Sequence, residues 1–270
     1  MKIVYNRKYE ARYPANPVEN PDRVRLTAVE LAKVGYEFTE PEPCSLQDIS
    51  QVHGKEHIDR VRESGLFEAA SLAAGGAVCA AELARQGEPT FALIRPPGHH
   101  AAANRAWGMC FFNNMAIAVR KIKPMAKKAL IIDIDLHFGD GTGSIFRGDT
   151  NVKIINPWSV DENFEYLNMD ESRYLSQVED AFQDFDCDIV GVSAGFDTYL
   201  EDWGGLLKMD DYRKIGKAIR KGAEKCGGCR FAVLEGGYHP DLRLCIKNFI
   251  EGFDWGRKDA CLAFCGLAGA

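Results

Sequence analysis

Short apolar runs that alternate with helical patterns constrain this chain more than any other feature. The runs are rich in β-branched residues and bounded by turn residues, and they cover Ile3–Tyr5, Phe91–Ile94, Ala129–Ile132, Val152–Ile155, Ile189–Val192 and Phe231–Leu234. The helical patterns between them span Arg23–Lys33, Ser71–Arg85, Asn114–Ile122, Ser172–Phe185, Asp210–Lys225 and Asp241–Ile250. Strands separated by helices need crossover connections, which join parallel strands. The sequence therefore predicts an α/β fold with a mainly parallel central sheet flanked by helices.

The length and organisation of the chain are typical of one domain. Its 270 residues suit a single large α/β domain with one core. It contains no internal repeat, no Ser-rich linker and no charge block, and the Pro-containing stretch at 14–21 is typical of a loop. We therefore predict a single domain over residues 1–270.

Charge and hydropathy exclude some classes of protein. The net charge of −6 and the pI of about 5.6 argue against a phosphate-binding surface, so we expect no direct nucleic-acid binding, and cationic substrates fit better. Met1 and Lys2 lead directly into the first apolar run, without the apolar stretch of a signal peptide. No apolar run approaches the roughly 18 residues of a membrane span. We expect a soluble, cytoplasmic protein, and the sequence predicts no particular oligomeric state.

The nine cysteines do not form the pattern of a disulfide scaffold. The close pair Cys226 and Cys229 has the spacing of a metal or redox motif, but a structural zinc site would need a second pair at similar spacing. Since no such pair is present, we expect reduced, mostly buried thiols.

Four polar segments begin where an apolar run stops. They are Arg95–His100, Asp133–His137, Ser193–Asp197 and Glu235–Tyr238. Ligands of parallel α/β sheets bind beyond the carboxyl ends of the strands, where the loops converge. We therefore expect these segments to meet at one edge of the sheet and to form the functional site there.

The segment from Asp133 to His137 has the pattern of a metal site. In an extended chain Asp133, Asp135 and His137 point to the same side, so Asp135 and His137 can bind one ion. Asp197, at the end of another predicted strand, is the best candidate for a third ligand. Two carboxylates and one imidazole suit a divalent transition metal, and a coordination position left for water makes such a site catalytic. The alternative is a loop of capping carboxylates, and the other three segments favour the metal.

Two histidines and a tyrosine supply acid–base and electrophilic groups. His99 and His100 follow a Pro-Pro-Gly turn, which restricts the backbone before them. A catalytic base needs a carboxylate on its other ring nitrogen, and Asp133 and Asp140 are both available. Tyr238 follows two glycines, and its hydroxyl can donate a hydrogen bond to a developing oxyanion. The alternatives are structural histidines and a core tyrosine.

These segments resemble, in order and spacing, the zinc-dependent histone deacetylase family, which includes the acetylpolyamine amidohydrolases. The resemblance spans roughly residues 1–250 and rests on Arg95–Ala101, Gly108–Asn114 (GMCFFNN), Asp133–Thr142 (DIDLHFGDGT), Ser193–Asp197 and Leu234–Tyr238. It implies an arginase-like α/β fold with a parallel sheet of about eight strands.

The resemblance also implies a cofactor and its ligands. It implies Zn²⁺ bound by Asp135, His137 and Asp197, and a site of this composition also accepts Fe²⁺ or Co²⁺. A structural K⁺ is expected near the 133–137 loop, held largely by backbone carbonyls.

The roles of the remaining residues follow from the same resemblance. It implies His99 paired with Asp133 and His100 paired with Asp140, with His100 as general base toward the attacking water and then as acid toward the leaving amine. Tyr238 is expected to polarise the substrate carbonyl. The residues expected to line the substrate pocket are Pro97, Gly108 and Met109.

Three positions depart from the family pattern. Phe138 stands where the family commonly has a second histidine after the metal ligand, which removes no ligand. Met109 stands where an aromatic residue usually lines the acyl-lysine tunnel, so the wall is softer there. After Asp197 the family commonly reads Asp-Pro-Leu-Gly-Gly, whereas Asp202–Gly205 reads DWGG in this chain. The rim of the pocket is therefore altered, and the short chain indicates a more open pocket.

Two substrate classes stay open: acylated lysine in a peptide or protein, and acetylated polyamine. A negative residue at the rim would favour the polyamine, and an open groove beside the pocket would favour the peptide. The candidate rim acids, for which a solvated surface is the alternative, are Asp161, Glu162, Glu165, Glu201 and Asp202. Less favoured are a manganese ureohydrolase, which needs further metal ligands, and a non-catalytic acyl-lysine-binding protein.

Overall fold

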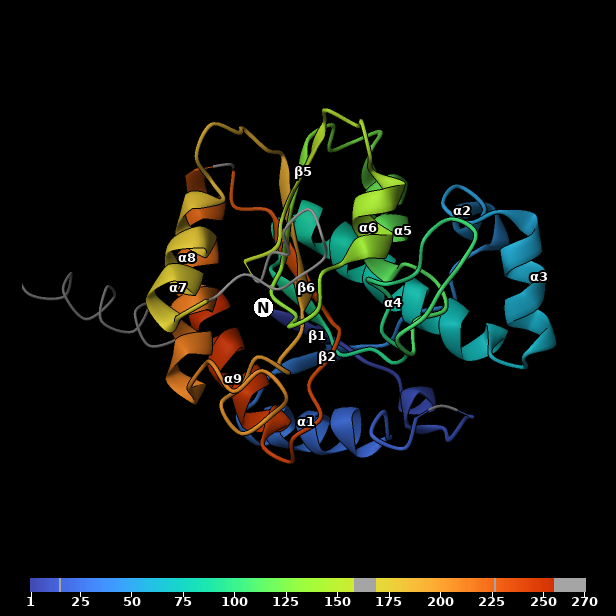
Figure 1. The fold of residues 1–270 in the computed structure, drawn as a ribbon, viewed down its shortest axis with the longest axis horizontal. Coiled ribbons are helices and arrows are strands. Elements are labelled where there is room, and N and C mark those ends of the chain that lie inside the picture. The colour runs from blue at the N-terminus through green and yellow to red at the C-terminus, as the bar shows by residue number, and fades with distance from the viewer. Residues whose placement is uncertain (15, 158–168, 226, 255–270) are drawn as a thin grey trace, which may run out of the picture.

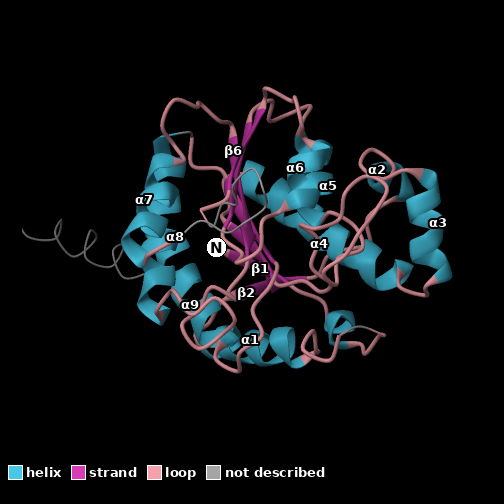
Figure 2. Cartoon of the chain, viewed as in Figure 1, coloured by secondary structure: helices cyan, strands magenta, loops and turns pink. Residues whose placement is uncertain are grey.

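A seven-stranded parallel sheet forms the centre of the computed structural model, which describes residues 1–14, 16–157, 169–225 and 227–254 (Figures 1 and 2). The strands lie in the order β2-β1-β3-β7-β6-β4-β5, and every neighbouring pair is parallel. Their bounds are Lys2–Val4 (β1), Glu37–Thr39 (β2), Thr90–Ala92 (β3), Ala129–Asp133 (β4), Val152–Ile155 (β5), Ile189–Ala194 (β6) and Arg230–Leu234 (β7). The predicted α/β architecture is confirmed, and the strand number is close to the eight expected.

Helices cover both faces of the sheet (Figure 1). α4 (Phe67–Arg85) and α5 (Asn114–Ile122) pack together on one face, and α8 (Met209–Lys225) and α9 (Leu242–Phe253) pack together on the other. The remaining helices are η1 (Arg7–Glu10, a 3-10 turn), α1 (Asp22–Lys33), α2 (Leu46–Ile49), α3 (Lys55–Glu63), α6 (Asp140–Ile145) and α7 (Glu171–Asp180). α1 packs on α9 and α7 packs on α8, whereas α3 lies outside α4.

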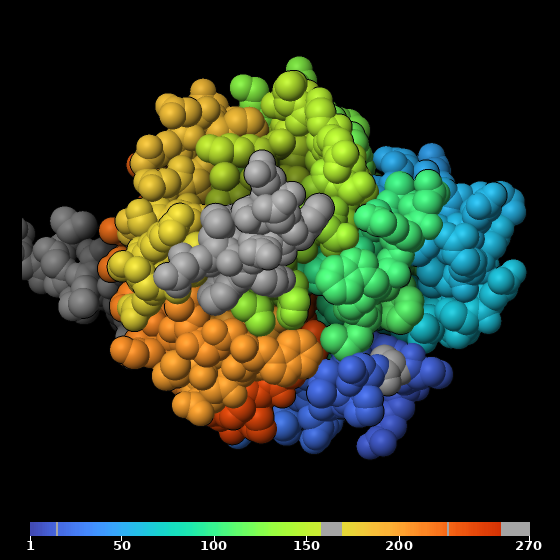
Figure 3. All heavy atoms as spheres, in the orientation of Figure 1, coloured from blue at the N-terminus to red at the C-terminus, as the bar shows by residue number. Residues whose placement is uncertain are grey.

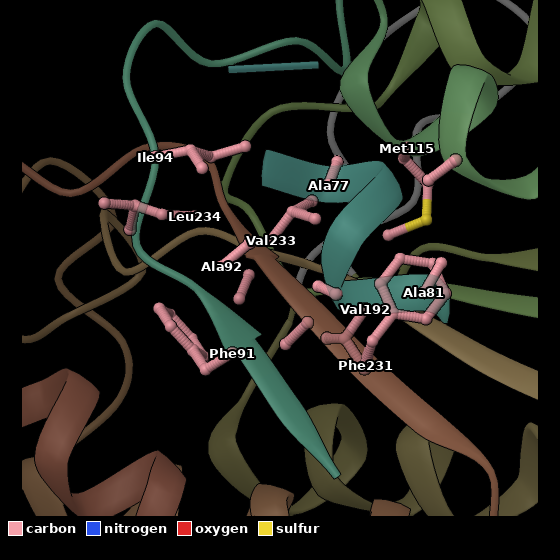
Figure 4. Close-up of a cluster of buried hydrophobic side chains, with 14 of the residues drawn as sticks. Ala77, Ala81, Phe91, Ala92, Ile94, Met115, Val192, Phe231, Val233 and Leu234 are labelled. Atoms are coloured by element: carbon pink, nitrogen blue, oxygen red, sulfur yellow. The ribbon is translucent and has the colours of Figure 1, made fainter. Parts of the chain in front are cut away.

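Small side chains let α4 lie close to the sheet. Ala77 and Ala81 belong to the buried cluster that includes side chains of β3 and β7 (Figure 4). A Cβ at Gly76 would lie 2.5 Å from Tyr9 Oη and 2.6 Å from Ile94 Cγ2, so only glycine fits there. The close contact buries α4 along most of its length and fixes it against the middle of the sheet.

α4 is also long and apolar enough to cross a membrane by length and composition. Its 18-residue window has a mean hydropathy of 1.3, and 61% of that window is buried inside the protein. The expectation that no run approaches this length was therefore wrong, because alanines and glycines keep the segment apolar without bulky side chains. A helix packed in a protein core passes the same test.

Several short elements were not predicted. β2 is missing from the predicted strands because it spans only Glu37–Thr39 and Glu37 and Phe38 are exposed. α3 is strongly polar, and α6 (DGTGSI) contains two glycines, which have low helix propensity. α7 ends at Asp180 rather than at Phe185. The elements that were missed are short or contain few apolar residues.

The four polar segments meet at one edge of the sheet, as predicted. β3, β7, β6 and β4 are neighbours, and each ends at one of these segments. In the register of the sheet Asp133 of β4 pairs with Ser193 of β6, and Ala194 pairs with Leu234 of β7. The strand ends are therefore level, which brings their loops together.

Candidate active site

Asp135, His137 and Asp197 bring three metal-binding atoms together at this edge. Their ligand atoms all lie within 4.8 Å of one another. His137 Nδ1 is 3.1 Å from Asp135 Oδ1 and 3.1 Å from Asp197 Oδ2. Asp197 Oδ2 is buried and accepts no hydrogen bond of good geometry, which is costly for a carboxylate oxygen. These three residues, called the cradle below, therefore fit a divalent metal ion.

Backbone groups and two glycines hold the carboxylates of the cradle. Gly236 N donates to Asp135 Oδ2 at 2.8 Å, and Leu136 N donates to Asp197 Oδ1 at 3.0 Å. A Cβ at Gly195 would lie 2.1 Å from Asp135 Oδ2, and a Cβ at Gly236 would lie 2.7 Å from Asp197 Oδ2. The sequence analysis assigned no role to these glycines, although both stand inside the polar segments. Any larger residue at either position would collide with the carboxylates.

The ligands converge through turns and not through strand alternation. β4 ends at Asp133, and the chain bends beyond it. Asp135 N donates to Asp133 Oδ1 at 3.1 Å, and His137 N donates to Asp135 Oδ1 at 2.9 Å. The prediction of an extended chain over 133–137 was therefore wrong. Aspartates that accept a hydrogen bond from the backbone two residues further on make turns. Their spacing in sequence is the same as in an extended chain with alternating side chains.

Each of the two adjacent histidines pairs with its own carboxylate. His99 Nδ1 lies 3.0 Å from Asp133 Oδ2, and His100 Nδ1 lies 2.7 Å from Asp140 Oδ1. Both histidines are buried, as is Asp133, whereas Asp140 at the start of α6 is half-buried. With Nδ1 donating to the carboxylate, Nε2 of His100 is left as the proton acceptor.

Burial and neighbouring charges make the two histidines electrostatically different. Burial, together with the adjacent His99, lowers the pKa of His100 to about 4. Burial acts in the same direction on His99, but Asp135 and Asp133 raise the pKa of His99 well above its usual value. At neutral pH His100 is therefore an uncharged imidazole, and His99 carries a proton between two carboxylates. Only His100 is in the protonation state of a general base.

Tyr238 lies in the same place and is anchored through its backbone. Asp202 Oδ2 accepts hydrogen bonds from Tyr238 N at 2.6 Å and from His239 N at 2.9 Å. The Tyr238 ring stacks on Trp203 at 4.3 Å, and the Arg23 guanidinium lies 4.9 Å from the ring centroid. The hydroxyl forms no hydrogen bond with another described residue, and burial raises its pKa, so it is a free protonated donor.

Asp202 belongs to this anchor and is not a free rim charge. Its carboxylate also accepts a hydrogen bond from Trp203 N at 2.9 Å, so three backbone groups point at it. The interpretation of Asp202 as a group that attracts cations is not supported, whereas Glu201 is exposed. The other candidate rim acids, Asp161, Glu162 and Glu165, lie outside the described residues, as does Cys226.

A pocket of about 150 Å³ joins these groups. The residues expected to contact substrate all line it, together with catalytic and metal-binding candidates: Pro97, His99, His100, Trp107, Gly108, Met109, Asp135, His137, Trp203, Gly236 and Tyr238. Gly108 and Met109 both have positive φ, 60° and 64°, and a Cβ at Gly108 would lie 2.5 Å from His100 Cδ2. The glycine therefore lets this turn rest directly on His100.

Trp107 covers the His100–Asp140 pair and was missed in the sequence. Its ring lies 3.8 Å from the His100 ring, and its Nε1 donates to both Asp140 oxygens at 3.2 and 3.1 Å. Burial would raise the pKa of Asp140, but hydrogen bonds from His100 and Trp107 lower it. Trp107 also supplies an aromatic wall to the pocket, which Met109 does not. The sequence feature that could have identified Trp107 is its position directly before the GMCFFNN segment.

Glu235 is a second residue without a role in the sequence analysis. It is buried, and its Oε2 accepts hydrogen bonds from Gly98 N at 2.7 Å and His99 N at 3.1 Å. Burial raises its pKa to about 7. Glu235 therefore fixes the backbone that carries His99 and His100.

A parallel α/β sheet with a candidate metal site and paired histidines at its carboxyl edge is typical of an α/β enzyme.

Comparison with known proteins agrees with this class. Residues 17–166 match the model of the histone deacetylase domain. A probable deacetylase from Methanothermobacter thermautotrophicus is 32% identical, over 94% of this chain and 91% of that protein. Acetylpolyamine amidohydrolase 2 from Pseudomonas aeruginosa is 32% identical, over 71% of this chain and 64% of that protein. The crystal structure of the HDA15 HD domain is 26% identical with a TM-score of 0.82, covering 93% of this chain and 88% of that one.

This chain belongs to the histone deacetylase family. The resemblance to this family is therefore confirmed, and the chain is an enzyme of the deacetylase type.

Proposed function

We propose that this chain is a zinc-dependent deacetylase that removes acetyl or other acyl groups from lysine side chains of peptides or proteins. One observation carries the proposal: Asp135 and His137 of the cradle, the uncharged His100 and Tyr238 all line one pocket of about 150 Å³. Amide hydrolysis needs a Lewis acid, a base and a donor for the oxyanion, and these groups supply a place for each.

The cradle residues would hold the metal. A bound Zn²⁺ would polarise the amide carbonyl and activate water at neutral pH, and Fe²⁺ or Co²⁺ would serve in the same ligand set. Asp197 Oδ2 supports this proposal because it is buried and accepts no hydrogen bond of good geometry. A K⁺ ion near residues 133–137 stays a prediction.

The residues of the chain would then move the protons. His100 Nε2 accepts a proton from the attacking water while Asp140 holds Nδ1. The Tyr238 hydroxyl donates a hydrogen bond to the carbonyl oxygen as it becomes negative. The carbon–nitrogen bond breaks as His100 returns the proton to the leaving amine, which releases the free amine and a carboxylate. The protonated His99 stays beside Asp133 and Asp135 and balances their charge.

The surroundings of the pocket favour acyl-lysine over polyamine. Among the described residues, the pocket lining contains no carboxylate except Asp135 of the cradle. Beside the pocket lies a second, open depression of about 540 Å³ between α3 and residues 104–111, called the side groove below. It shares Trp107 and Met109 with the pocket, so a peptide can continue from one into the other. Acetylpolyamine hydrolysis is the second candidate, supported by the Pseudomonas aeruginosa relative.

The proposal is tested by amine release from a panel of substrates. The panel contains acetyl-lysine peptides, longer-chain acyl-lysine peptides and acetylated polyamines. The wild-type protein is loaded with Zn²⁺, and Asp197→Ala protein serves as the blank. We expect turnover of acyl-lysine peptides above the blank and slower turnover of polyamines. Turnover confined to polyamines would favour the second candidate, and no turnover with metal bound would contradict the deacetylase proposal.

A further inference from the structure

The part of the side-groove lining that the structure describes carries two arginines and no carboxylate. Arg60 of α3 and Arg105 are both exposed, and neither forms an ion pair with a described residue. Arg60 Nη2 donates only to the backbone oxygen of Asn104, at 2.6 Å. Arg62, on the same helix, behaves differently, because it pairs with Asp59 at 3.4 Å. In a chain with a net charge of −6, the groove is thus a local cationic site.

The groove lies within reach of a peptide whose acyl-lysine is in the pocket. Arg105 is two residues from Trp107, so their Cα atoms are at most about 7 Å apart. Trp107 lines both depressions, and a peptide advances about 3.3–3.6 Å per residue. A side chain one or two positions from the acyl-lysine can therefore reach Arg105 when the peptide leaves the pocket past Trp107. Figure 3 shows α3 in blue beside the green loop that carries Arg105, on the right of this face.

The groove is held in place by contacts between α3 and the loop. His57 Nε2 lies 2.7 Å from the backbone oxygen of Phe111, and Gly54 N donates to the backbone oxygen of Ala103 at 2.9 Å. The Arg60 hydrogen bond to Asn104 adds a third link. A binding surface that is already ordered loses little conformational entropy when a ligand binds. Val61 and Phe111 give the lining an apolar part that suits a peptide backbone and side chains.

We infer that the side groove binds the peptide segment next to the acyl-lysine and selects an acidic residue one or two positions away, through Arg105 and Arg60. The inference rests on the proposed acyl-lysine deacetylase activity. A carboxylate there meets guanidinium groups that have no other carboxylate partner among the described residues. The distal ammonium of a polyamine would meet the same two positive charges, which disfavours that substrate.

The test compares peptides that differ at one position. Acetyl-lysine peptides carry Glu, Gln or Lys at each position up to two residues from the acetyl-lysine, and kcat/KM is measured with Zn²⁺-loaded protein. An exposed ion pair of this kind predicts a Glu-over-Gln preference of up to roughly five-fold at the best position. The preference should shrink at high salt, because these charges are exposed.

Variants of the arginines separate binding from folding. In Arg105→Gln the Glu-over-Gln ratio should fall toward one, and in Arg105→Glu the Lys peptide should become the best of the three. Arg62→Gln is the matched control, since Arg62 lies on α3 outside the groove, and it should keep the wild-type ratio. A ratio within one preparation does not depend on the fraction of active protein.

Two outcomes would overturn the inference. One is a wild-type Glu-over-Gln ratio near one at every position, and the other is a ratio that Arg105→Glu leaves unchanged. In both cases turnover of the Gln peptide would show that the deacetylase proposal still holds. No turnover of any peptide, with acetylated polyamine hydrolysed instead, would overturn the inference together with the proposed substrate.

Discussion

The cradle and the rim of the pocket are built in different ways. In the cradle every carboxylate is buried, accepts hydrogen bonds from backbone N–H groups and touches a glycine that no larger residue could replace. The rim consists of exposed side chains, with Trp107 52% exposed and Trp203 54% exposed. Yet both tryptophans contact a catalytic candidate, His100 or Tyr238.

This difference separates the residues whose geometry the reaction requires from those whose contacts can vary. Metal binding requires one arrangement of the three cradle ligands. The strand ends and backbone hydrogen bonds hold the ligands in that arrangement. The rim has only to cover and orient the acid–base groups, which side chains of several kinds can do. We therefore expect substitutions in the cradle to abolish turnover, and substitutions in the rim to lower kcat by smaller factors.

Removing a cradle ligand should have the largest effect. Asp197→Ala takes away one of three ligand atoms that lie within 4.8 Å of one another. We expect loss of bound metal and a fall in turnover well beyond the roughly 10- to 100-fold that follows loss of an outer partner of a metal ligand. Metal content per chain and turnover check this, with circular dichroism as the control for folding. Full turnover in this variant would contradict the role of the cradle.

Removing the Tyr238 hydroxyl should come next. Tyr238→Phe leaves the stacking on Trp203 in place and removes a hydroxyl without a hydrogen bond to another described residue. We expect kcat to fall by about 10²–10³-fold, as for loss of an oxyanion donor, with little change in melting temperature. Unchanged turnover would contradict this role and show that another group stabilises the oxyanion.

Weakening the hydrogen bonds that Asp202 accepts at the rim should have a smaller effect. Asp202→Asn puts an amide where a carboxylate accepts from Tyr238 N, His239 N and Trp203 N. Because hydrogen bonds to charged groups contribute about 1.5–3 kcal/mol, we expect a loss of unfolding free energy of that order. Displacement of Tyr238 should lower kcat by roughly 10-fold. Denaturant unfolding and steady-state kinetics measure the two effects, and wild-type values for both would argue against an anchor.

The smallest effect is expected at Trp107. Trp107→Phe keeps a ring over His100 but loses the Nε1 hydrogen bonds to Asp140, which remains paired with His100. We expect kcat to fall by about 3- to 10-fold, the effect of about one hydrogen bond. Trp107→Ala, which also removes the ring, is the matched comparison and should be slower. A Phe variant slower than the Asp202→Asn variant would break the proposed order.

The sequence predicted the cradle side of this comparison better than the rim. Strand ends are visible as apolar runs that stop, and Asp135, His137 and Asp197 stand directly after them. The prediction that these segments share an edge follows from the parallel sheet alone. The turns at Asp133 and Asp135 were not predicted, because the spacing of the carboxylates fits both an extended chain and a turn.

The rim could not be predicted because its contacts depend on how loops fold and not on where buried strands end. Trp107 meets Asp140, and Asp202 meets Tyr238, through loop conformations that periodicity does not encode. The side groove likewise depends on how α3 packs beside the loop after β3. β2 and α3 were also missed, since β2 spans three residues and α3 is mostly polar.

Zinc titration of chelator-treated wild-type protein tests the central claim most directly. Turnover of an acetyl-lysine peptide and bound zinc per chain are measured on the same samples as zinc is added back. The cradle predicts no turnover without metal and a rise in proportion to bound zinc that ends at one ion per chain. Full turnover in metal-free protein, or saturation with zinc that restores none, would contradict the assignment of Asp135, His137 and Asp197 as the catalytic metal site.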